Sequence, residues 1–105
     1  MIRKAYLITA KPGMEKEYER RHNPVWPEIA AIMKEHGVIS WSTYLHKPTN
    51  AMFCYVEIED EERYNAMAEI PVCKKWWKYM TEVLVCSSSD AEKGKEEELR
   101  EIFHF

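Results

Sequence analysis

The first third of the chain passes from an apolar run to a segment with helical spacing. Ile2 to Thr9 has the length and composition of a strand, and Pro12-Gly13 after it is typical of a turn. From Met14 to His36, apolar and aromatic residues return at spacings of four and three, which predicts helix. Pro24 interrupts this stripe, so we expect two helical pieces on one surface, the second closed by Gly37.

Two strands are predicted next. Ile39 to His46 alternates, with Trp41 among the residues on one side. Lys47 to Asn50 has the composition of a turn. Ala51 to Ile58 is apolar at both odd and even positions, which predicts a strand that is covered on both faces.

The last part of the chain combines helices, a polar segment and a final strand. The acidic start of residues 60–68 favours a short helix, and after Pro71 a further helix is expected from about Val72 to Leu84. Residues 87–98 are polar and low in complexity, and we interpret them as a flexible linker. Leu99 to Phe105 has apolar residues spaced in twos and is predicted as the last strand.

This order of elements predicts an α+β fold, a ferredoxin-like βαββαβ subunit formed by a single domain over residues 1–105. Helices on one face of such a sheet leave the other face open. A second copy of the chain would cover that face together with the aromatic tail, so we expect a homodimer, a dimeric α+β barrel. The edge strand at Leu99 to Phe105 is a candidate for pairing across the dimer.

Charge and cysteine content narrow the class of protein. The formal net charge of -3 argues against a nucleic-acid binder, which would carry a basic face. The apolar run at Ile2 to Thr9 is too short for a signal peptide or a membrane span. Cys54, Cys73 and Cys86 show no Cys-x-x-Cys spacing, and reduced thiols in a cytoplasmic protein are the simplest interpretation.

Tyr18 and His22 are the first candidates for chemistry. They are four residues apart, so a helix places them on one face, and Pro24 puts His22 near the end of that helix. A helix C-terminus raises the pKa of a histidine and burial lowers it, and the sequence leaves the sum open. On spacing alone, a hydrogen-bonded core histidine is the more frequent role, and Tyr18 would be a core aromatic.

Trp76 and Trp77 are the second candidates. A broad apolar helix face can hold both as core anchors. The functional alternative is an aromatic wall with two indole donors, completed by Trp41, which suits the C–H faces and hydroxyl rim of a sugar. No spacing of histidine and cysteine predicts a metal site.

Several segments together resemble the L-rhamnose mutarotase family. The resemblance runs in order from the start of the chain to about Thr81 and is looser beyond it. The segments that carry it are Met1–Ala5, Glu17-Tyr18, Arg20–Pro24, Trp26–Glu28, Val56–Glu59, Val72-Cys73 and Trp76–Thr81.

The resemblance implies a dimeric α+β barrel that interconverts the α and β anomers of L-rhamnopyranose with no cofactor or metal. It implies that His22 is the proton donor and that Tyr18, Trp76 and Trp77 contact the sugar. The resemblance also implies a sugar contact at Trp41, where the family commonly has Tyr; an indole cannot accept a hydrogen bond as a phenol can, so Trp41 would contact the sugar without that acceptor. Alternatives are a cofactor-free or haem-dependent monooxygenase on the same barrel, or a non-enzymatic ligand-binding domain.

Overall fold

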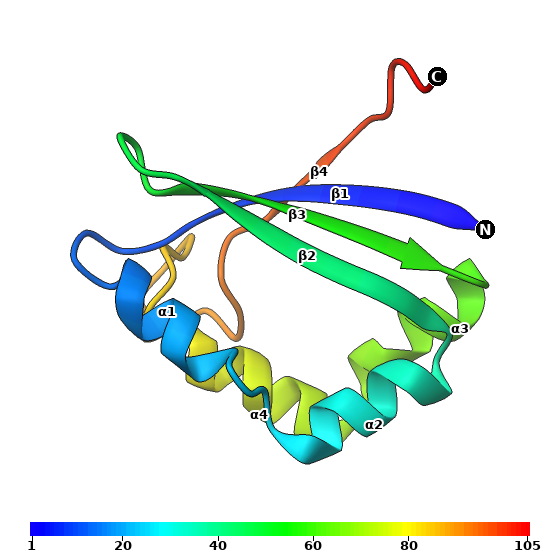
Figure 1. Cartoon of the computed structure of the whole chain (residues 1–105). Helices are drawn as coiled ribbons and strands as arrows, with labels where there is room; N and C mark the ends of the chain where they lie inside the picture. Colours follow the sequence, from blue (N-terminus) through cyan, green and yellow to red (C-terminus); the bar gives the residue numbers. More distant parts are fainter.

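The computed structural model describes residues 1–105, and all of its helices lie on one face of an antiparallel sheet (Figure 1). In chain order the elements are β1 (Ile2–Thr9), α1 (Glu15–Arg21), α2 (Pro27–Glu35), β2 (Val38–His46), β3 (Ala51–Ile58), α3 (Glu61–Ala66), the 3-10 turn η1 (Met67–Glu69), α4 (Pro71–Met80) and β4 (Glu97–Leu99). The strand order is β2-β3-β1-β4. The predicted α+β class and ferredoxin-like βαββαβ order are therefore confirmed.

Strand β3 shows why the two faces of the sheet differ. Met52, Cys54, Val56 and Ile58 are buried under the helices. Phe53 points to the opposite face and is 46% exposed, because no helix of this chain covers that face. The expectation that this strand is covered on both faces thus holds within one chain only for the face that carries the helices.

The helix ends follow from local chemistry. Helix α1 ends at Arg21, and α2 begins at Pro27, which occupies the first turn, where a proline costs no hydrogen bond. Gly37 follows α2 with φ of +80°, a conformation that favours glycine. The Asp60 carboxylate accepts a hydrogen bond from the backbone N–H of Arg63 at 2.8 Å and so caps α3.

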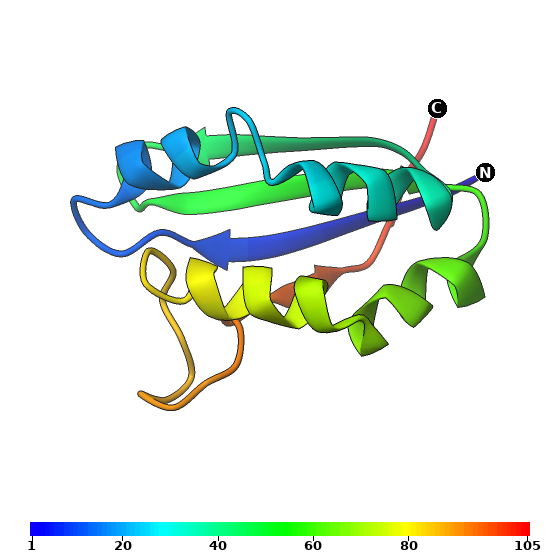
Figure 2. The same cartoon turned by 90° about the horizontal axis from the view of Figure 1, so that it is seen from below.

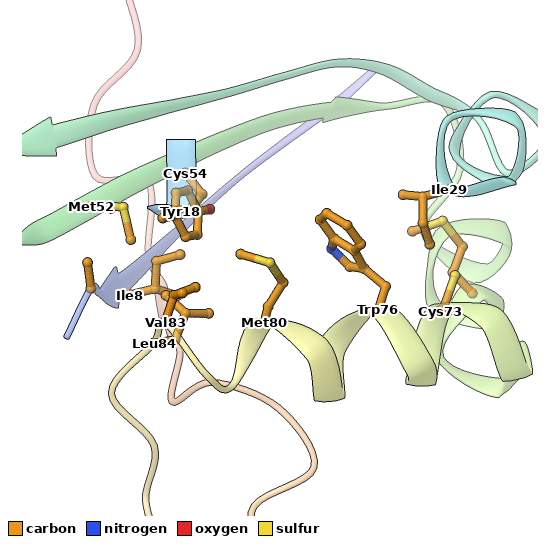
Figure 3. Packing of buried hydrophobic residues seen from close by; sticks show 12 residues of the cluster. Ile8, Tyr18, Ile29, Met52, Cys54, Cys73, Trp76, Met80, Val83 and Leu84 are labelled. Atoms are coloured by element: carbon orange, nitrogen blue, oxygen red, sulfur yellow. The ribbon is translucent and has the colours of Figure 1, made fainter. Parts of the chain in front are cut away.

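The helices lie in two rows across the sheet, α1 with α2 in one row and α4 with α3 in the other (Figure 2). The core lies between these rows and the sheet. Figure 3 shows Tyr18 from α1 beside Cys54 and Ile8 of the sheet. Met80 and then Trp76 follow along α4 toward Ile29, and all of these side chains belong to one buried cluster. Contact between the rows therefore brings the predicted aromatic candidates of α1 and α4 into one core.

The predicted end of the last long helix was wrong. Helix α4 stops at Met80 and not near Leu84. Val83 and Leu84 are buried because the chain there runs beside the end of β1. Leu84 forms a bridge with Ala10, and the Val85 N–H donates to the Thr9 carbonyl at 2.8 Å.

The predicted last strand was also displaced. β4 comprises Glu97 to Leu99, paired with β1, so the linker predicted over 87–98 ends at residue 96. Arg100 to Phe105 forms no strand, and Phe103 and Phe105 are exposed. Strand pairing occurs at Glu97 to Leu99 because the edge of β1 lies beside these residues. The apolar residues spaced in twos in the tail have no packing partner within this chain. None of the helices combines the length and the apolar character needed to span a bilayer.

Candidate functional site

A cluster of three aromatic rings joins α1 to α4. The rings of Tyr18 and His22 stack with their centroids 4.2 Å apart and 27° between their planes. The rings of Trp76 and His22 meet edge to face, with their centroids 5.3 Å apart and 81° between their planes. Tyr18 and Trp76 are buried, whereas His22 is partly exposed, so His22 is the ring of this cluster that a solute reaches.

The hydrogen bonds of His22 fix its tautomer. His22 follows the last residue of α1, and its Nδ1 lies 3.0 Å from the backbone carbonyl oxygen of Tyr18. A carbonyl oxygen can only accept, so Nδ1 carries the hydrogen. In the neutral ring this leaves the lone pair on Nε2, which makes Nε2 a proton acceptor.

Burial sets the protonation of the cluster. It lowers the pKa of His22 below the ordinary 6.5, against the opposing effect of the Tyr18 carbonyl. The imidazole is therefore mainly neutral at pH 7. Burial raises the pKa of the Tyr18 phenol, whose hydroxyl lies within hydrogen-bonding reach of Thr43. Tyr18 is thus a neutral donor and not a base at physiological pH.

Trp77 and Trp41 do not join the cluster. Trp77 lies on the neighbouring face of α4, and the Lys93 ammonium is 4.8 Å from its ring centroid. Trp41 lies opposite Val56 on the helix-facing side of the sheet, is 42% exposed, and has Tyr64 as its ring partner at 6.4 Å. The predicted wall of Trp76, Trp77 and Trp41 is therefore not one continuous surface, because adjacent helical residues diverge by about 100°.

Further aromatic residues complete the surroundings. Trp26 and Tyr79 both contact Trp76, with ring centroids at 4.9 and 5.8 Å, and stack on each other at 5.2 Å. Sequence spacing could have indicated Tyr79, which lies three residues after Trp76 on the same helix. Trp26 precedes α2, and its contact with Trp76 depends on how α2 and α4 pack, so no spacing indicated it.

A hydroxyl pair lies on the sheet side of the same layer. The Tyr64 hydroxyl donates to the Tyr6 hydroxyl at 3.2 Å, and both side chains are partly buried. Burial raises the pKa of Tyr64, so the pair is neutral at physiological pH. No sequence pattern linked these residues, since they are 58 positions apart.

The three-ring cluster and the tyrosines around it combine apolar ring faces with one proton acceptor and several hydroxyl donors. Such a site suits a small neutral polyhydroxylated molecule on which one proton is moved. A surface hollow of about 610 Å³ lies beside Trp26 and Tyr79 and is lined by Lys74, Lys75 and Lys78. It contains none of the proton-transfer candidates. Nowhere do three or more histidine, cysteine, aspartate or glutamate side chains gather as a metal site requires.

Comparison with known proteins gives a consistent result. An L-rhamnose mutarotase of Escherichia coli O8 (strain IAI1) is 47% identical over 104 residues, which cover 99% of this chain and 98% of the relative. The crystal structure of an L-rhamnose mutarotase from Formosa agariphila superposes with a TM-score of 0.86 at 24% identity, covering 100% of this chain and 99% of that one. A crystal structure from Pseudomonas aeruginosa shares the fold with a TM-score of 0.61 at 14% identity, over 96% of this chain and 93% of that one. The family model for L-rhamnose mutarotase matches residues 3–105, and this chain belongs to that family.

Proposed function

We propose that this protein interconverts the α and β anomers of L-rhamnopyranose and that His22 carries the proton. The observation that supports this role most directly is the bond from Nδ1 to the Tyr18 carbonyl, which leaves Nε2 free as an acceptor. The relatives named L-rhamnose mutarotase support the substrate and the reaction. The neutral state that burial gives the imidazole suits a group that first takes a proton and then returns it.

The proposed reaction opens and recloses the hemiacetal. Nε2 of His22 takes the proton of the anomeric hydroxyl, the electrons of that O–H bond form the C1 carbonyl, and the bond from C1 to the ring oxygen breaks. The ring oxygen takes the proton back from Nε2, so no proton is gained or lost. Rotation of the aldehyde and the reverse steps give the other anomer. General acid–base catalysis of this kind contributes roughly 10²–10⁴-fold.

We propose that one imidazole serves both proton transfers. Tyr18 is a weaker candidate for the second group, because burial raises the pKa of its phenol. Its ring instead holds the His22 ring by stacking at 4.2 Å. Trp76 would support the His22 ring. Membership of the mutarotase family supports Trp77 and Trp41 as further sugar contacts, and both side chains are at least partly exposed outside the cluster.

We also propose a cytoplasmic homodimer. The sheet face opposite the helices carries Phe53 and Tyr44, which are 46% and 65% exposed. A second copy would cover these side chains. Cys54, Cys73 and Cys86 are unpaired, which favours a reducing compartment.

The test is nuclear magnetic resonance saturation transfer between the anomeric protons of L-rhamnose. Wild-type protein at catalytic concentration should exchange saturation faster than buffer alone. His22→Asn keeps a donor toward the Tyr18 carbonyl and cannot take a proton, so we expect exchange at the buffer rate from a folded variant. Exchange by wild type no faster than buffer would end the mutarotase proposal. Full activity in His22→Asn would instead remove His22 from the mechanism.

A further inference from the structure

Arg21 is the most heavily bonded side chain at the end of α1. Its Nε binds the Glu17 carboxylate of the same helix at 2.7 Å. Its Nη1 donates to the backbone carbonyl of Tyr79 at 2.8 Å, and its Nη2 pairs with Glu82 at 2.9 Å. The guanidinium carbon lies 4.0 Å from the centroid of the Tyr79 ring. One side chain therefore links α1 to the last turn of α4 and the residues just after it.

Arg20 provides an internal contrast. It also pairs with Glu17, and its interaction with α4 is limited to the side chain of Tyr79. Its side chain is 67% exposed, whereas that of Arg21 is 10% exposed. Two neighbouring arginines thus share the same carboxylate, and only Arg21 also bonds the Tyr79 carbonyl and the Glu82 carboxylate. A planar fork that is mostly buried and fully bonded holds its partners far better than an exposed ion pair.

The contacts of Arg21 lead directly to the histidine. Tyr79, which lies under the guanidinium, packs against Trp76 at 5.8 Å, and Trp76 meets His22 at 5.3 Å. His22 is also the next residue after Arg21 in the chain. The end of α1 is therefore tied to α4 twice, once by the bonds of Arg21 and once by the contact between His22 and Trp76.

The length of α1 makes this tie important. The helix has only seven residues and no side-chain cap at its start. An isolated helix of this length is not stable in water, so its orientation depends on what it packs against. Without the bonds to Tyr79 and Glu82, the turn that carries His22 would be held mainly by Tyr18 in the core.

We propose that Arg21 is a positioning residue that fixes the His22 ring against Trp76 by bonding the end of α1 to the end of α4. The expected effect on turnover rests on the proposed function, whereas the placement of His22 rests on the contacts between α1 and α4 alone. Arg21 touches neither the imidazole nor the site where a sugar would be bound. Its loss should reduce turnover more than sugar affinity, since misplacing a reacting group by about 1 Å can cost about 100-fold in rate.

The test compares Arg21→Lys with Arg20→Lys. Both keep the positive charge and remove the fork, but only the first loses the bonds to the Tyr79 carbonyl and to Glu82. The ring protons of His22 stack under Tyr18 and beside Trp76, so their resonances are displaced by ring currents, and they are recorded without sugar. We expect Arg21→Lys to move these resonances toward the values of an exposed histidine, to lower kcat by about tenfold or more and to change KM by less than about threefold. Arg20→Lys should leave the His22 resonances, kcat and KM unchanged.

A second variant covers the case in which Arg21→Lys does not fold. Glu82 is 63% exposed, so Glu82→Lys should fold while repelling the guanidinium from α4. It should move the His22 resonances in the same direction. Unmoved resonances and unchanged kcat in the folded variant would overturn the inference. If wild type failed to speed anomer exchange, the proposed function would fail, while the resonances of His22 would still test the role of Arg21.

Discussion

At the level of single residues, His22 links protonation directly to activity. Its pKa lies below the ordinary 6.5 because the ring is buried, and only the neutral ring has a free Nε2. We therefore expect the anomer exchange rate to reach a plateau at high pH, where the ring is neutral, and to fall as the pH drops through the lowered pKa. Saturation transfer between pH 5 and 8, with the buffer rate subtracted, measures this profile. A rate that rises on acidification would show that the protonated ring is the active form.

The same shift has a consequence for stability. A histidine with a lowered pKa in the folded state binds its proton more readily when unfolded, so folding stability increases with pH around these values. The contribution of His22 is fully present above the unfolded pKa and is lost as the pH falls toward the folded one. Chemical unfolding at several pH values should show this loss in wild type and less of it in His22→Asn, which does not titrate.

Tyr6 and Tyr64 form a hydrogen-bonded pair whose contribution to the free energy of unfolding can be measured. Each hydroxyl is partly buried and has the other as its partner at 3.2 Å. Changing either residue to Phe leaves the other hydroxyl without that partner, which should cost about 1 kcal/mol of unfolding free energy. The double variant should cost less than the sum of the two single variants, because it leaves no orphaned group. Additive costs in urea unfolding would mean that water replaces the lost partner freely.

At the level of elements, the segment between α4 and β4 is held by two hydrogen bonds and by the close approach of Gly94 to Leu84. The N–H of Lys95 donates to the carbonyl of Val85 at 3.0 Å, and Lys78 binds the carbonyl of Ala91 at 3.1 Å. A Cβ at Gly94 would lie 2.6 Å from Cδ1 and 2.9 Å from Cβ of Leu84. Because Leu84 is buried, it cannot move aside without disturbing the core.

Gly94→Ala should therefore destabilise the fold by about 1–3 kcal/mol through overpacking. Adding Leu84→Ala removes the atoms that clash, so the double variant should cost less than the sum of its parts. Gly13→Ala is the matched control, since its φ of +79° costs backbone strain but no atom lies within 4 Å of the new Cβ. Its cost should add to that of Leu84→Ala. Thermal and urea unfolding measure both pairs, and additivity at Gly94 would contradict the steric reason.

The elements also show what the sequence could predict. Pro24 and Pro27 restrict the backbone wherever they occur, and Gly37 tolerates the positive φ that ends a helix, so the breaks in the first helical stripe were predictable. The end of α4 was not, because Val83 and Leu84 continue its apolar spacing while packing beside β1. A local pattern reports that a residue is buried and not which neighbour buries it.

The candidate site divides in the same way. Tyr18 and His22 could be paired from a spacing of four within one helix, and the structure stacks their rings. The contact of Trp76 with His22 depends on how α4 packs against α1, which no spacing gives. Arg21 and Tyr64 were missed for this reason, since each acts through a partner 58 positions away.

At the level of the whole molecule, the sheet has one covered and one open face. On the open face Tyr44 lies opposite Phe53, and Phe53 lies opposite Leu7 across the central strands. These three side chains form an apolar row in the middle of that face. Farther along the strands on the same face, the hydroxyls of Ser40 and Tyr55 donate to the Glu57 carboxylate. These groups give the apolar centre a polar border. An apolar centre with a polar rim is the usual composition of a protein interface.

The open face therefore predicts the oligomeric state. We expect light scattering at micromolar concentration to give twice the chain mass of 12.5 kDa. Phe53→Lys places a charge in the centre of the apolar row and should yield the single-chain mass without unfolding, since Phe53 is 46% exposed within one chain. Ala31→Lys adds the same charge on an exposed position of α2, in the helix layer, and should stay a dimer. A wild-type particle of 12.5 kDa would contradict the dimer, and a dimeric Phe53→Lys would place the contact elsewhere on the surface.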